Sequence, residues 1–160
     1  MNSDQSLYEV YFQKSSPYYL DKLEKFNKGQ KYTFNVYAFL FGIFWYFYRK
    51  MYLESLLIIG IFLLFSLAEL IFIPLLKQDI VRTLDFFVTF ITAGISGSLA
   101  NYLYLKKANR EIKAAINRGE EAESLKKEIK QKGGVTYWFL IILVAAMVFL
   151  FFYNNYYNAG

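Results

Sequence analysis

The sequence predicts an all-α membrane protein with three transmembrane helices, and three observations lead to this fold class. The chain has 160 residues, 56% of them hydrophobic, and its apolar residues come in unbroken runs. It has no Cys and no His, which excludes disulfide frameworks, Cys/His zinc sites, thiolate nucleophiles and imidazole bases. Its 18 Lys and Arg stand mostly between the apolar runs, so they can be used to infer topology.

Residues 1–31 are expected to form a cytoplasmic N-terminal segment with one short amphipathic helix. Ser16 suits the N-cap, Pro17 the first helical position and Gly29 the stop. The charges on the polar face nearly cancel, which favours packing on the rest of the protein over a place on the membrane surface. The apolar face has four residues: Tyr19, Leu20, Leu23 and Phe26.

An aromatic helix over residues 32–52 is expected to lie in the membrane interface or to re-enter it. Residues 32–48 contain no charge and hold 10 of the aromatic residues, whose Tyr and Trp side chains favour the headgroup level. If this stretch formed a fourth span, the Lys and Arg would divide seven against eleven between the two sides. If it does not cross, the division is sixteen inside against two outside, and such a bias is typical of a stable topology.

Residues 53–160 are expected to form a helical membrane domain with spans over about 53–76, 86–105 and 135–153. A helix over the first run rises about 36 Å, enough for a hydrocarbon core of about 30 Å. Between the last two spans, residues 106–134 are expected to form a cytoplasmic helical hairpin. Its first helix continues the second span, and glycines at 119 and 133–134 end its two helices.

Glu69 lies inside the first predicted span, where a charged carboxyl costs at least about 2.5 kcal/mol near the bilayer centre. We expect it to face the helix bundle, to stay protonated or to have a partner. Thr89 and Thr92 lie at a comparable depth in the antiparallel second span. Two roles stay open: a protonated carboxyl bonded to a threonine hydroxyl, or a relay for protons or cations.

Small residues recur in the second span at Ala93, Gly97 and Ala100, and Asn101 follows one turn after Gly97. Small residues let helix backbones approach closely, and an Asn facing a neighbouring helix adds a hydrogen bond. This pattern predicts either tight packing within one chain or the contact face of a homodimer.

A lipid-headgroup anchor is expected at the end of the aromatic stretch, formed by Trp45, Tyr48, Arg49 and Lys50. Anionic lipid favours each basic residue near the surface by about 1 kcal/mol. Nucleic acid is not an expected partner, because glutamates interleave with the lysines of the 106–134 loop and no stacking aromatics accompany them.

Residues 34–52 follow the pattern FNxxAFxFGxxWxxYRKMY, and Asn101-x2-Tyr104 and Gly133-Gly134 follow later in the chain. These features resemble a bacterial domain-of-unknown-function family of small inner-membrane proteins. The resemblance extends from about Gly29 to the last span and implies a multi-pass protein of the bacterial cytoplasmic membrane. It implies no activity and no catalytic or binding residues.

The sequence predicts a non-enzymatic protein with a structural, scaffolding or regulatory task and a cytoplasmic N-terminus. No catalytic residue, metal site or cofactor is expected, because there is no nucleophile elbow, metal-ligand cluster or pair of carboxylates near a span. The expected partners are membrane lipids and either further copies of the chain or a larger membrane complex. The alternative is a small oligomeric transporter or ion-conducting protein that uses Glu69.

Overall fold

The structure is a computed structural model that describes residues 3–72, 78–119 and 121–158, and all regular structure within these ranges is helical. The predicted all-α class is therefore confirmed. The elements are α1 (Ser3–Phe12), a 3-10 turn η1 (Gln13–Ser15), α2 (Ser16–Asn27), α3 (Val36–Phe41), α4 (Ile43–Tyr48), α5 (Tyr52–Phe72), α6 (Gln78–Ile116), α7 (Ala122–Lys132) and α8 (Trp138–Asn158).

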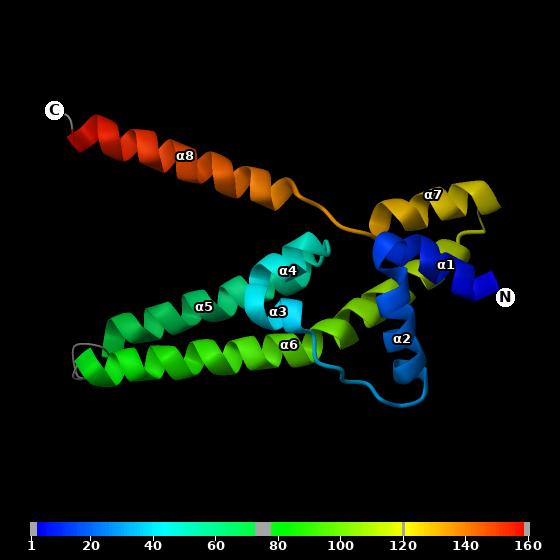
Figure 1. Cartoon of the computed structure of the whole chain (residues 1–160), viewed down its shortest axis with the longest axis horizontal. Coiled ribbons are helices and arrows are strands. Elements are labelled where there is room, and N and C mark those ends of the chain that lie inside the picture. The colour runs from blue at the N-terminus through cyan, green and yellow to red at the C-terminus, as the bar shows by residue number, and fades with distance from the viewer. Residues whose placement is uncertain (1–2, 73–77, 120, 159–160) are drawn as a thin grey trace.

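The molecule is elongated, and its helices separate into two regions along the long axis (Figure 1). We call α1, η1, α2, α7 and residues 100–116 of α6 the head. We call α5, residues 78–99 of α6 and α8 the three arms. The arms all extend from the middle of the molecule toward the same end, where the C-terminus lies, and the N-terminus lies at the opposite end.

The core of the head consists of aromatic rings packed around α6. Phe12 and Tyr104 are fully buried, with ring centroids 5.8 Å apart, and Tyr19 lies 5.1 Å from Phe12 and 4.7 Å from Tyr104. Small and branched residues of α6, Ala108 and Ile112 among them, complete this core. Each buried aromatic side chain contributes about 1.5 to 3 kcal/mol through the hydrophobic effect, so the head has a sizeable core of its own.

Helix α7 closes the head by direct contact of its C-terminal end with α1. The backbone N–H of Gly134 donates to the carbonyl of Tyr11 at 2.8 Å. A Cβ atom at Gly133 would lie 2.1 Å from the same carbonyl oxygen, so only glycine permits this approach. The two glycines therefore end α7 and also fix it to α1.

The N-terminal segment differs from the expectation of one short helix. Helix α1 precedes α2, and Gln13, at φ +53°, turns the chain between them. The signal for α1 is the apolar set Leu7, Tyr11 and Phe12, in which Leu7 and Tyr11 are four positions apart, as on one face of a helix. Pro17 lies in the first turn of α2, and Gly29, at φ +94°, follows that helix.

The aromatic stretch also differs from the expected single helix. It forms two six-residue helices, α3 and α4, that meet at Gly42. Gly42 has φ +49° and ψ −126°, a conformation that residues with a side chain rarely adopt. Each helix rises only about 9 Å, so neither can cross a hydrocarbon core of about 30 Å, and residues 32–48 form no fourth spanning helix.

Two of the described helices are long and apolar enough to cross a membrane: Tyr52–Ile71 and Asp79–Ile116. Only 6% and 17% of their most apolar stretches are buried, so their apolar side chains lie mostly on the surface of the molecule. Trp138–Asn154 is a shorter apolar helix. Residues 73–76 of the first expected span lie outside the described residues.

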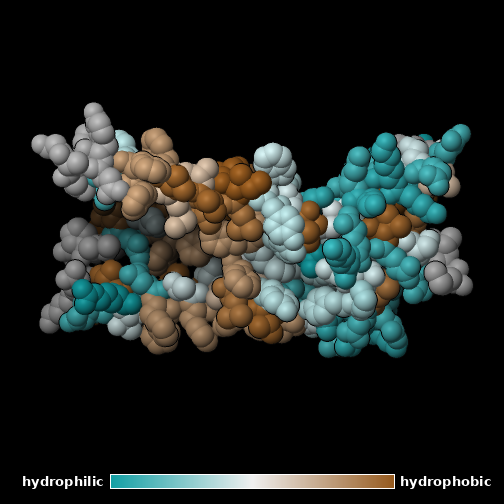
Figure 2. All heavy atoms as spheres, turned by 45° about the horizontal axis from the view of Figure 1, so that its top comes forward, coloured by the Kyte–Doolittle hydropathy of each residue, from teal (hydrophilic) through white to brown (hydrophobic). Residues whose placement is uncertain are grey.

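Apolar side chains gather over the arms, and polar side chains gather over the head (Figure 2). Leu70 on α5 is 74% exposed and Phe149 on α8 is 66% exposed. Helix α6 passes from one region into the other without a break and ends at Ile116, three residues before Gly119. The structure thus joins a polar end to an apolar end through one continuous helix.

Candidate functional site

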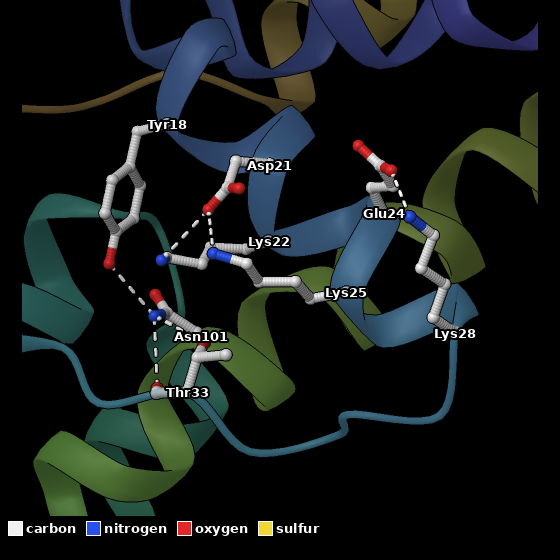
Figure 3. Close-up of polar contacts among 8 residues, drawn as sticks. All are labelled: Tyr18, Asp21, Lys22, Glu24, Lys25, Lys28, Thr33 and Asn101. Atoms are coloured by element: carbon white, nitrogen blue, oxygen red, sulfur yellow. Dashed lines mark hydrogen bonds and ion pairs between the residues drawn. The ribbon is translucent and has the colours of Figure 1, made fainter.

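Asn101 is the centre of a buried polar network that joins the head to the α3–α4 turn. Its side-chain Nδ2 lies 3.0 Å from Tyr18 Oη and 3.0 Å from Thr33 Oγ1 (Figure 3). Its Oδ1 accepts a hydrogen bond from Asn35 Nδ2 at 2.8 Å. Asn101 therefore bonds to segments far away in sequence, and not to a neighbouring spanning helix.

Asn35 carries this network into α3. It is the N-cap of that helix, and its Oδ1 accepts from the backbone N–H of Ala38 at 3.0 Å. Its own backbone N–H donates to the carbonyl of Gly97 at 2.8 Å. Asn35 and Asn101 are 1% and 0% exposed, so every one of these bonds replaces a bond to water.

The small residues of the second span allow α3 to approach α6 within the same chain. A Cβ atom at Gly97 would lie 2.9 Å from atoms of both Phe34 and Phe39. Ala100 is fully buried and Ala93 is half-buried. Of the two alternatives that the sequence left open, the structure places Gly97 and Ala100 in packing within the chain.

The neighbouring cations Arg49 and Lys50 have separate environments. Lys50 Nζ donates to the carbonyls of Gln131 and Gly133 at 2.8 and 2.7 Å. These carbonyls belong to the C-terminal end of α7, where a cation is favourable. Arg49 lies inside the protein with 8% of its surface exposed, and not at the surface as an open anchor would.

The guanidinium of Arg49 is surrounded by tyrosine rings. Its Cζ lies 4.8 Å from the ring centroid of Tyr19 and 5.4 Å from those of Tyr48 and Tyr104. Its Nη2 donates to Ser15 Oγ at 3.0 Å. Among the residues that the structure describes, its Nε and Nη1 have no well-aligned hydrogen-bond acceptor although they are buried.

A cavity of about 660 Å³ adjoins Arg49. Its polar wall includes Ser15 and Asn35, and its apolar wall includes Phe44, Phe139 and Leu140. Trp45 and Tyr48 line it as well, so three of the four predicted anchor residues meet at one cavity. Headgroup anchoring by these residues stays a prediction. The three residues line a pocket and do not form an open surface patch.

Glu69 has a different partner from the one that its depth suggested. A side-chain hydrogen bond joins it to Asp85 on α6. Thr89 is exposed and Thr92 is half-buried. Asp85 was missed because it directly precedes the uncharged run and was counted outside the span, whereas α6 already begins at Gln78.

The structure thus defines a class of helical protein: an aromatic head, a broken aromatic turn and three exposed apolar helices. The chain belongs to the family described as "Protein of unknown function (DUF2628)", whose model matches residues 6–110. The match runs from α1 into the part of α6 that lies in the head, so it includes Arg49, Asn35 and Asn101. No curated protein and no solved structure matches the chain.

Proposed function

We propose that this chain is a three-span integral protein of the bacterial cytoplasmic membrane with a non-enzymatic scaffolding or regulatory task. The observation that carries the proposal is the separation of the two surfaces, with the arms exposing apolar side chains and the head exposing polar ones. Exposing apolar surface of this extent to water is unfavourable in free energy, so lipid or a partner must cover it. The apolar part of helix α8, the third arm, is Trp138–Asn154, whose length is at the lower limit for a span.

The direction of the helices supports a cytoplasmic N-terminus and a C-terminus on the other side. Because α5 and α8 both point away from the head, the chain ends at the opposite side from the one where it begins. The sixteen Lys and Arg of the expected cytoplasmic segments belong to the head and its adjoining loops, while Arg82 lies near the start of α6, at the end of that arm away from the head. Both features follow the positive-inside rule.

The topology can be tested with a reporter protein that is active only in the cytoplasm. A fusion after Gly160 should give no signal, whereas an insertion at Gly119, between α6 and α7, should give a strong one. A strong signal from the Gly160 fusion would contradict the three-span arrangement.

The scaffolding task can be tested by cross-linking in native membranes. The exposed α8 makes few contacts within the chain, so we expect cross-linkers placed on it to capture further copies of the chain or the subunits of one complex. A matched cross-linker on α7 in the head reports contacts with cytoplasmic proteins. If the α8 cross-links are spread evenly over abundant membrane proteins, the scaffolding proposal is wrong.

A second candidate function is proton or cation conduction, and the Glu69–Asp85 contact favours it. Two carboxyl groups can share a hydrogen bond only while one of them carries a proton. In this candidate, vesicles containing the protein conduct protons, and Glu69→Gln and Asp85→Asn abolish the flux. Asp79→Asn, which changes an exposed acid at the start of α6, is the matched control. Wild-type vesicles as tight as empty ones would exclude this candidate.

A further inference from the structure

The scaffolding task leaves the buried charge of Arg49 unexplained. Its Nε and Nη1 have no acceptor, and within the described ranges no Asp or Glu forms an ion pair with it. A buried cation without a counter-ion is unfavourable, because burial removes its hydration. An anion of suitable shape would therefore be attracted to this position.

The surrounding rings narrow the kind of anion. The tyrosine rings attract the guanidinium charge through their faces, but among the described residues Nε and Nη1 have no well-aligned hydrogen-bond acceptor. A guanidinium has two planar forks of N–H groups, Nε with Nη2 and Nη1 with Nη2, and each fork matches two oxygens of a phosphate or a carboxylate. In Arg49 each fork contains one donor without an acceptor among the described residues. The vacant donors of Arg49 are thus suited to an oxyanion.

The lining of the cavity beside Arg49 includes both polar and apolar side chains. Arg49 bonds to Ser15, and Asn35 is a further polar residue of the lining, whereas Phe44, Phe139 and Leu140 are apolar. Its volume of about 660 Å³ is that of a small-molecule site. A ligand that fills it has an anionic group and an apolar part.

The location of the cavity points to the same kind of ligand. Phe139 and Leu140 lie in the first turn of α8, where the apolar surface of the arms begins. The ring of Phe139 stacks on that of Phe44 at 6.1 Å, so α8 and α4 form a continuous apolar wall. Phe41 and Leu140 are 56% and 40% exposed, which leaves this wall open to a lipid chain.

We propose that this cavity, which we call the Arg49 site, binds the phosphate of an anionic phospholipid. The guanidinium donates to the phosphate oxygens, and the apolar wall contacts the first carbons of the acyl chains. The proposal rests on the proposed membrane location for the supply of ligand, but not for binding, which detergent-solubilised protein can show. Free phosphate has the same oxyanion as the phospholipid but has no acyl chains.

Three probes separate the parts of the ligand in native mass spectrometry of the full-length protein. Dioctanoyl phosphatidylglycerol has phosphate and chains, dioctanoylglycerol has the chains alone, and inorganic phosphate has the anion alone. We expect the complete lipid to bind at least about tenfold more tightly than either part. Inorganic phosphate that binds as tightly as the lipid would overturn the proposal.

Two variants test the two ends of the site. Arg49→Gln removes the charge, and Leu140→Glu places a carboxylate in the apolar wall, where the first turn of α8 tolerates an acid. Both should weaken lipid binding by about tenfold or more. The controls are Lys126→Gln on α7, with the same charge change as Arg49→Gln, and Ile142→Glu, which is 67% exposed and outside the cavity lining.

The outcome does not depend on Arg49→Gln folding. If this variant does not fold, the comparison of Leu140→Glu with Ile142→Glu decides, because both leave the buried cation in place. Equal lipid affinity in the wild type, Leu140→Glu and Ile142→Glu would refute the proposal that the Arg49 site binds phospholipid. That result would leave the topology reporters unaffected, so failure of the site and failure of the membrane proposal are distinguishable.

Discussion

The head and the arms are built from the same kinds of residue, but they hold themselves together in different ways. Phe12 in the head is fully buried among Tyr8, Tyr11, Tyr19 and Tyr104, whereas Phe149 on α8 is 66% exposed. The head therefore draws its stability from its own side chains. The arms depend on whatever surrounds them, and the same substitution should have different consequences in the two regions.

Alkaline pH should give the largest difference in stability between the head and the arms, because it acts on several residues of the head together. Burial raises the pKa of Tyr11 and of Tyr19 above the ordinary 10.0, and Glu111 adds to the rise for Tyr11. A raised pKa contributes stability that is complete below the unfolded value and is lost as pH rises above it. We expect near-ultraviolet circular dichroism of the head to collapse above about pH 10 while the helicity of the arms persists.

Tyr19→Phe should make this alkaline transition shallower, because it removes one buried group that must ionise. Tyr37→Phe, at a ring that is 66% exposed, is the control. The pKa of Lys50 is lowered by burial, so its contribution changes in the opposite direction and moderates the loss. A transition of equal steepness in the wild type and Tyr19→Phe would refute the assignment to buried tyrosines.

Truncation of the head core should give the largest effect of any single substitution. Phe12→Ala leaves a cavity among four rings and should lower the free energy of unfolding by about 3 to 5 kcal/mol. Phe149→Ala, at an exposed ring, should change the stability of the head by less than about 0.5 kcal/mol. Thermal unfolding in one detergent measures both, and equal losses would mean that the arms share the stability of the head.

Loss of the polar network comes next. Asn101→Leu keeps the volume but leaves Asn35, Tyr18 and Thr33 without their partner, at a loss of about 1 to 3 kcal/mol. Ser98→Leu, one turn earlier on α6 at an exposed position, should be neutral. If urea unfolding gives the two variants the same stability, the network contributes nothing beyond its apolar contacts.

The smallest predicted effects come from one substitution made at two glycines. Both Gly42 and Gly60 have open space around them, so Gly→Ala meets no clash at either. At Gly42 the positive φ strains the alanine and should destabilise by about 1 to 2 kcal/mol. At Gly60, inside α5, the same change should stabilise by about 0.4 to 1 kcal/mol. Opposite signs in paired unfolding curves confirm the turn, and equal signs refute it.

The sequence by itself determined the features that depend on local patterns. The apolar runs indicated which helices expose apolar faces, and glycines at 119 and 133–134 indicated where α6 and α7 end. The division of Lys and Arg between the two sides already argued against a span over residues 32–48. These features depend on hydrophobic periodicity and on backbone freedom, which residues close in sequence control.

Only the tertiary structure decided what the singled-out side chains contact. Asn35 and Asn101 are 66 positions apart, and Arg49 bonds to Ser15 across 34. Glu69 is joined to Asp85 from another helix, and Lys50 bonds to carbonyls of α7. The physical reason is that the packing of the helices determines which side chains are buried and which form pairs. The same pattern of residue types along the sequence is compatible with many ways of packing the helices. The sequence therefore indicated that Arg49 matters, but only the fold placed it inside a ring of tyrosines.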